Sequence, residues 1–209
     1  MAFIEPLILY AVLFFRISAG PSGESVEFSA AAELVRIFLY NIPSLALIWY
    51  LLLKVKSLKE WDIMPGKRDL MPIALALPAL ILIGLTISLV SHVDGIPSGS
   101  RFLPPQTAVT WVILIISCVS TAYLEESFFR FYLLSKRDAM GLGPHRAILI
   151  STMVFASCHI YEGPWGFLNA ALSGIVLAYI FLRFRSLHGI AVSHAMYNIA
   201  VYAMGSLSA

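Results

Sequence analysis

Charged residues are scarce in this chain of 209 residues, and their scarcity excludes most soluble folds. Only 12% of the residues are Asp, Glu, Lys or Arg, whereas 59% are hydrophobic and the mean hydropathy is +0.85. Soluble domains hold about 25% charged residues, and a soluble fold has no interior large enough to bury such an excess of apolar side chains. We therefore expect lipid to be the solvent for much of the surface.

Other features are missing as well, and each absence excludes a class of protein. The formal net charge is only +2 and there is no basic tail, so no nucleic-acid partner is expected. The two cysteines, Cys118 and Cys158, lie in apolar stretches without the spacing of a disulfide framework or a zinc site, and we interpret them as core residues. The N-terminus lacks the basic segment of a signal peptide, so its first apolar stretch is interpreted as a helix of the mature protein.

What the chain does have is a series of apolar stretches separated by Gly and Pro breakers. The sequence predicts an all-α fold, a polytopic transmembrane helix bundle of about seven spans that forms a single domain over residues 1–209. Three of the stretches are long enough to cross a hydrocarbon core of about 30 Å, and the other four are shorter, so tilted or thin spans are expected for these. The stretches are Phe3–Phe15, Leu34–Leu53, Ile73–Val90, Ala108–Leu134, Ala147–Ile160, Leu168–Leu182 and Ile190–Met204.

The basic residues predict the orientation of this bundle. If seven spans alternate from a cytoplasmic N-terminus, the cytoplasmic loops hold ten of the 14 Lys and Arg residues, the opposite side holds three, and Arg130 lies within the fourth stretch. Enrichment of every cytoplasmic loop is what the positive-inside rule expects, so a cytoplasmic N-terminus is predicted. The ten are Lys54, Lys56, Lys59, Lys67, Arg68, Lys136, Arg137, Arg146, Arg183 and Arg185, and the three are Arg16, Arg36 and Arg101.

The fourth stretch contains ionisable residues that are costly in lipid. Glu125 and Glu126 are adjacent and Arg130 follows; each costs about 2.5–3.5 kcal/mol at the centre of a membrane helix, and such residues usually face a bundle interior or a hydrated cavity. Glu126 and Arg130 are four residues apart and can pair on one helix face, which a structural salt bridge explains. Glu125 points about 100° away from this pair, so it cannot share Arg130 equally and is expected to be unpaired. A carboxylate without a cation in apolar surroundings takes up protons readily, as a general base must.

Two later stretches carry polar residues that can complete a site. The fifth ends at His159, four residues after Phe155, and the seventh contains His194 and Asn198, also four residues apart. A single histidine in an apolar helix is most simply a hydrogen-bonded contact between helices. Two histidines, an asparagine and a spare glutamate together can bind one water molecule and donate to a developing oxyanion. The remaining histidines fall in predicted loops and receive no role: His92, His145 and His188.

These three motifs in this order resemble the CPBP family, the CAAX-protease and bacteriocin-processing membrane proteins, also called the type II CAAX prenyl endopeptidase or Abi family. The motifs are Glu125-Glu126-x-x-x-Arg130, Phe155-x-x-x-His159 and His194-x-x-x-Asn198. Each motif alone is weak because spacings of four residues recur in every helix, but the ordered trio is fairly specific. The resemblance covers a motif-bearing core over residues 108–204.

The resemblance implies an intramembrane glutamic endopeptidase that needs no cofactor. Glu125 would activate water, His159 would help to hold that water, and His194 and Asn198 would stabilise the oxyanion. Two residues would support the site, one of them able to assist directly: Arg130 and Glu126. The expected partners are the lipid bilayer and a membrane-associated polypeptide substrate, including one with a lipid modification or a hydrophobic C-terminal tail, and the expected location is a prokaryotic plasma membrane.

Three other interpretations stay open. Glu125, His159 and His194 could supply three ligands to a catalytic zinc ion, although the chain has no His-Glu-x-x-His spacing. Ionisable residues inside a membrane also form proton relays in transporters and channels, but here they cluster and no repeated pair of broken helices accompanies them. The third interpretation is a non-enzymatic membrane scaffold or immunity-type protein.

Overall fold

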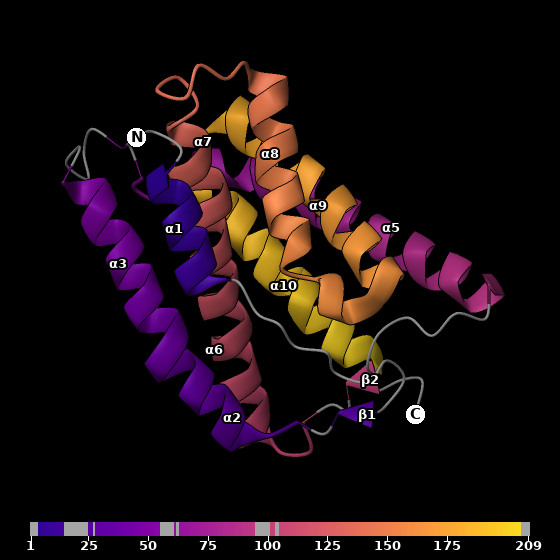
Figure 1. Ribbon diagram of the computed structural model, residues 1–209. Coiled ribbons are helices and arrows are strands. Elements are labelled where there is room, and N and C mark those ends of the chain that lie inside the picture. The colour runs from indigo at the N-terminus through magenta and orange to yellow at the C-terminus, as the bar shows by residue number, and fades with distance from the viewer. Residues whose placement is uncertain are drawn as a thin grey trace.

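The computed structural model describes residues 4–14, 25–26, 28–54, 61, 63–94, 101–102 and 105–205. Most of these residues are helical (Figure 1). The first helices are α1 (Ile4–Leu13), α2 (Ala30–Val35), α3 (Ile42–Leu53) and α5 (Leu70–Asp94). They are followed by α6 (Ala108–Glu125), α7 (Leu133–Ser135), α8 (Pro144–Ser157), α9 (Gly163–Phe184) and α10 (Leu187–Gly205).

Short segments join several of these helices into longer bodies. A π-helical turn, Arg36–Asn41, connects α2 to α3, and a second one, Glu126–Tyr132, connects α6 to α7. Turns of 3-10 helix, Lys67–Asp69 and Ile160–Glu162, precede α5 and α9. Away from the helices, β1 (Ser25–Val26) pairs in parallel with β2 (Arg101–Phe102).

The described helices thus form seven bodies, one on each predicted apolar stretch, and the all-α prediction is confirmed. Four of the bodies are long and apolar enough to cross a membrane: Ala30–Leu53, Lys67–Val93, Ala108–Ser135 and Ile160–Phe184. The count of seven spans and the cytoplasmic N-terminus stay predictions. The loop positions predicted for three histidines are wrong, because His92 lies in α5, His145 in α8 and His188 in α10.

Polar contacts fix one end of the bundle. His188, in the first turn of α10, donates from Nε2 to the carbonyl of Ile63 (2.7 Å) and accepts the hydroxyl of Tyr123 on Nδ1 (2.9 Å). The Ser186 hydroxyl donates to Asp69 Oδ1 at 2.5 Å, which ties the start of α10 to the start of α5. Lys136, just after α7, pairs with Glu5 of α1 at 2.7 Å. The ends of α7 and α9 and the starts of α1, α5, α8 and α10 therefore lie together.

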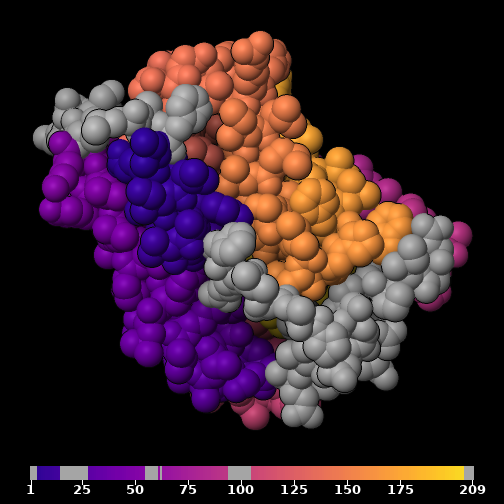
Figure 2. Space-filling view, in the orientation of Figure 1, coloured from indigo at the N-terminus to yellow at the C-terminus, as the bar shows by residue number. Residues whose placement is uncertain are grey.

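The helices pack closely in the middle of the bundle. On the face shown in Figure 2, α1 lies between α3 and α8, and the ring of its neighbour Phe14 packs 4.9 Å and 4.8 Å from those of Phe128 and Phe129. Between α9 and α8, Gly174 lies against Thr152 and Phe155, where an added Cβ would approach their side chains to 3.1 Å and 3.2 Å. Small residues permit this kind of close approach in membrane bundles.

Candidate active site

Glu126 is the most buried acid of the described region and joins two helices. Its side chain is fully buried, and its Oε1 lies 3.2 Å from Nη1 of Arg130, whose side chain is also buried. The same oxygen accepts a hydrogen bond of 2.8 Å from Nδ1 of His194 in α10. One carboxylate thus binds a guanidinium on its own helix and an imidazole on another, and desolvated charges require this kind of pairing.

The turn that carries Glu126 and Arg130 is π-helical over Glu126–Tyr132. Single π turns inside α-helices are rare and often occur at functional sites. The spacing of four residues still brings Glu126 and Arg130 into contact, as the sequence predicted, but the π turn itself was not predicted, because the sequence pattern was interpreted with α-helical geometry throughout.

Glu125 has different surroundings from its neighbour. Its side chain is 16% exposed and its Oε2 lies 3.7 Å from Nε2 of His194. Since Nδ1 of His194 donates to Glu126, the opposite ring nitrogen is held facing Glu125. No other charged partner within 4 Å is found for Glu125 in the described part of the chain.

Phe155 packs against three of the polar side chains. Its ring lies 4.2 Å below the guanidinium of Arg130, and its centroid is 5.0 Å from that of His159 and 6.1 Å from that of His194, both edge to face. A cation over a desolvated ring is stabilised by about 2 kcal/mol. The phenylalanine of the second motif therefore fixes the relative positions of residues from all three motifs.

His159 has a partner that the sequence analysis missed. Its Nδ1 lies 2.8 Å from Oε1 of Glu162, in the turn between α8 and α9. Gly166 makes room for this acid, since a Cβ at position 166 would come within 2.9 Å of Glu162 Oε2. The Nε2 of His159 is buried without a hydrogen-bond partner among the described residues. A spacing of three residues after a candidate histidine was the available signal for Glu162.

Glu125, His159, His194 and Asn198 line one cavity of ≈ 530 Å³, with Glu162 beside them. Asn198 is half-buried on α10, one turn from His194. The wall of the cavity also contains Asn169 of α9, whose Nδ2 donates to the Tyr197 hydroxyl at 3.1 Å. The structure therefore brings together the residues that three separate motifs contribute, and it adds Glu162 to them.

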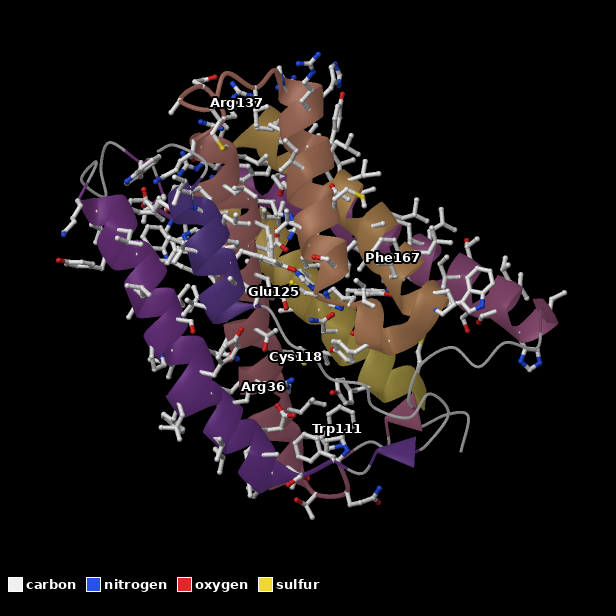
Figure 3. The ribbon with its side chains drawn as sticks, in the orientation of Figure 1. Arg36, Trp111, Cys118, Glu125, Arg137 and Phe167 are labelled. Atoms are coloured by element: carbon white, nitrogen blue, oxygen red, sulfur yellow. The ribbon has the colours of Figure 1, made fainter. Side chains whose placement is uncertain are left out.

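A second polar group lies farther along the same cavity, and the sequence analysis did not predict it. Arg36 pairs with Glu33 and donates to the hydroxyl of Ser117 at 2.9 Å, while Ser117 donates to Glu33. Figure 3 shows Glu125 and then Cys118 along α6, followed by Arg36 on the neighbouring body formed by α2 and α3. The cysteine interpretation holds for Cys118, which is buried, and both cysteines line this cavity.

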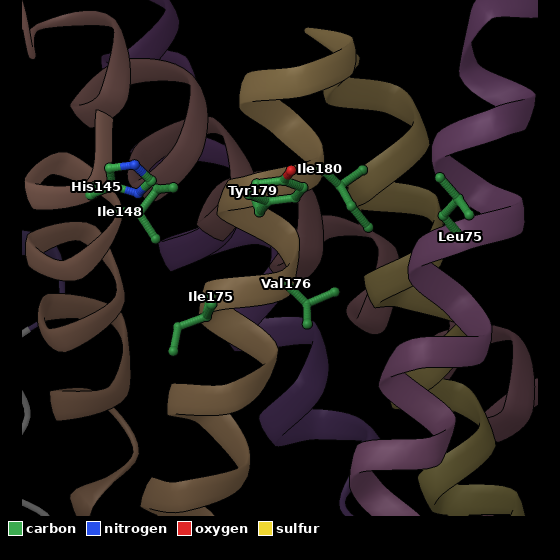
Figure 4. A pocket seen from close by; sticks show the side chains of 7 residues that line it. All are labelled: Leu75, His145, Ile148, Ile175, Val176, Tyr179 and Ile180. Carbon is green, nitrogen blue, oxygen red and sulfur yellow. The ribbon is translucent and has the colours of Figure 1, made fainter. Parts of the chain in front are cut away.

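Two further observations concern ligands. Within the described residues, no group of three or more His, Cys, Asp and Glu side chains is arranged to hold a metal ion. A separate groove of ≈ 480 Å³ lies between α5, α8 and α9, and its wall is almost entirely apolar (Figure 4). Its lining residues are Leu75, His145, Ile148, Ile175, Val176, Tyr179 and Ile180. None of these belongs to the three motifs.

Comparison with known proteins supports the motif interpretation. Residues 107–200 match the family model described as type II CAAX prenyl endopeptidase Rce1-like, and this range nearly coincides with the predicted motif-bearing core. Neither the curated proteins nor the solved structures give a match to the chain. The apolar helices and the family match indicate an integral membrane protein. The resemblance predicted from the ordered motifs is therefore confirmed: residues 107–200 are similar to the type II CAAX prenyl endopeptidase Rce1-like family, consistent with the CPBP family.

Proposed function

We propose that this protein is an intramembrane endopeptidase that hydrolyses a peptide bond with water activated by Glu125. The observation that supports this most directly is the different environment of two adjacent acids. Glu126 is neutralised by Arg130 and His194, whereas Glu125 faces the cavity beside Nε2 of His194. Glu126 is therefore occupied by contacts within the protein, whereas Glu125 is available to a bound water molecule.

The proposed reaction uses residues that line the cavity. Glu125 accepts a proton from water, and the resulting hydroxide attacks the carbonyl carbon of the scissile bond. His159 accepts a hydrogen bond from the same water on Nε2, because its Nδ1–H is directed to Glu162. The oxyanion receives hydrogen bonds from Nδ2 of Asn198 and from Nε2 of His194 in its imidazolium form. Collapse of the intermediate breaks the C–N bond, and Glu125 returns the proton to the leaving amine.

Glu126 and Arg130 act through His194 in this scheme and do not touch the substrate. The carboxylate of Glu126 holds the imidazole by its Nδ1, so the orientation of Nε2 is set before substrate binds. Arg130 balances the buried charge of Glu126. Preorganised donors of this kind need no rearrangement when charge develops on the substrate, which is why they lower the barrier.

The proposed substrate is a membrane-associated polypeptide. A cavity enclosed by membrane helices admits a segment that lies in or next to the bilayer, including one with a lipid modification or a hydrophobic tail. The proposed location is a prokaryotic plasma membrane, with seven spans and a cytoplasmic N-terminus. No cofactor takes part in the proposed mechanism.

The experiment that tests the function compares cells that contain the wild type with cells that contain Glu125→Ala. New protein termini are identified by mass spectrometry of the membrane fraction. Termini present with the wild type and lost with Glu125→Ala support proteolysis. Asp138→Asn is the matched control, since Asp138 is an exposed acid in the turn after α7. Identical termini in all three strains, with each protein folded and present at equal level, would favour the scaffold interpretation instead.

A further inference from the structure

The charged residues of the described chain are unevenly distributed between the two ends of the bundle. Eight of the basic residues lie at one end of the bundle, where the contacts of His188, Asp69 and Lys136 join helix ends and where α3 also ends (Figure 1), and we call this the basic end. Arg137 marks it in Figure 3. The eight are Lys54, Lys67, Arg68, Lys136, Arg137, Arg146, Arg183 and Arg185. Membrane proteins keep such loops in the cytoplasm.

The cavity extends from Glu125 away from the basic end. Its lining includes Ser29 and Ala32 at the start of α2, Val201 and Tyr202 near the end of α10, and Gly166 in the first turn of α9. These starts and ends all lie at the opposite end of the bundle, because consecutive helices alternate in direction (Figure 1). Ser29 and Ala32 are exposed, so the wall of the cavity extends to surface residues at this end.

Between Glu125 and the basic end, the bundle is filled. Side chains from Glu126 to Leu134 are all buried, and the ring of Tyr132 stacks on that of Phe128 with centroids 5.7 Å apart. Phe131 packs edge to face against Phe181 of α9 at 5.9 Å. None of the cavity-lining residues belongs to the basic end. The described core therefore separates Glu125 from the basic loops.

From this arrangement we propose that the catalytic cavity is entered from the extracytoplasmic side of the membrane, and that the substrates are polypeptides whose cleavage site lies outside the cytoplasm or at the outer membrane surface. This inference rests on the proposed proteolytic function. It selects among the substrates compatible with the site: membrane-anchored or exported segments fit, whereas a modified C-terminus that stays in the cytoplasm does not.

The outer part of the cavity also indicates what kind of segment enters. Arg36 is paired with Glu33, so this part of the wall presents polar groups without net charge. Phe28 and Val201 contribute apolar surface to the same part of the cavity. A mixture of apolar walls and a few polar groups is typical of pockets that bind uncharged ligands. An extended, largely uncharged segment therefore suits this entry better than a strongly acidic or basic one.

Cysteine accessibility tests the side of entry. In a background with Cys118→Ala and Cys158→Ala, Ala32→Cys places a thiol at the cavity mouth and Ala139→Cys places one in the exposed turn at the basic end. A membrane-impermeant maleimide applied to intact spheroplasts is expected to label position 32 and to spare position 139, and inside-out vesicles should give the reverse. Labelling of position 139 from outside, or of position 32 from inside, overturns the proposal. If the cysteine-free background does not accumulate, alkaline phosphatase inserted at Ala139 of the wild type decides the same question, since activity there would overturn it.

The termini found in the comparison of wild type with Glu125→Ala give the second measurement. We expect the lost cleavage sites to map to extracytoplasmic segments. Sites that depend on Glu125 but map to cytoplasmic segments would refute the side of entry while leaving proteolysis established. If position 32 is labelled only from outside but no cleavage site is lost with Glu125→Ala, the cavity lies on the outer side and the proteolytic function is refuted. The two failures are thus distinguishable.

Discussion

Replacing the two adjacent acids by glutamine, one at a time, separates catalysis from stability. Glu125→Gln removes a carboxylate that is partly exposed to the cavity, and Glu126→Gln removes one that is fully buried between Arg130 and His194. Both substitutions preserve side-chain length and remove the same charge. Any difference between the two variants therefore comes from the surroundings of the two positions.

The structure gives the expected sizes. Loss of one partner from a buried ion pair costs about 3–5 kcal/mol because the other charge stays desolvated, and Arg130 would be that charge. For a protein of this length such a loss lowers the melting temperature by roughly 6–20 °C. For Glu125→Gln we expect a stability within about 1 kcal/mol of the wild type, because removal of a partly exposed charge leaves no buried charge behind. Its turnover should fall by about 10²–10⁴-fold, the usual contribution of a general base.

The assay combines thermal unfolding in detergent with cleavage of a substrate found by the terminus comparison. The double variant Glu126→Gln/Arg130→Gln is the matched control, and it should recover part of the lost stability because neither charge is left alone. The reasoning is refuted if Glu126→Gln has the same melting temperature as the wild type, or if Glu125→Gln cleaves at the wild-type rate.

Three further outcomes are expected. Glu162→Gln should lower turnover and change its pH profile with little loss of stability, and Glu162→Asp should restore part of the rate; an unchanged profile would mean that the acid does not orient His159. Gly174→Ala should reduce turnover by displacing Phe155, which an added Cβ would approach at 3.2 Å, and a variant that is as stable and as active as the wild type would contradict this role for the ring. Treatment with a chelator should leave cleavage intact, since the described residues offer no group of three metal-binding side chains; inhibition that added zinc reverses would favour the metalloprotease interpretation.

The sequence predicted the helices well because lipid imposes a simple rule on them. A backbone in hydrocarbon must satisfy its own hydrogen bonds, so long apolar stretches become helices, and Gly and Pro mark the joints. The rule does not locate polar residues, and His188 shows why the sequence placed it in a loop. His188 extends α10 although it is polar, since its two ring nitrogens bind Tyr123 and Ile63 in the folded bundle. Such partners come from distant parts of the chain and leave no local pattern.

The site was predictable in its membership but not in its connections. Spacing alone indicated that Glu126 pairs with Arg130, and the structure places them 3.2 Å apart. The bond from His194 to Glu126 was not expected, because it depends on how α10 packs against the π turn. Glu162 escaped notice because it follows the predicted end of its helix. The roles assigned to Glu125, His159, His194 and Asn198 stay predictions.

The double attachment of Glu126 has a consequence for how this protein can vary. Its carboxylate contacts a cation on its own helix and an imidazole on α10, so a neutral substitution at position 126 removes a partner from both of them at once. Among related chains, positions 126, 130 and 194 are expected to change as a set, or to stay fixed together. Sequences in which one of them drifts freely while the other two remain would show that the triplet is not a unit.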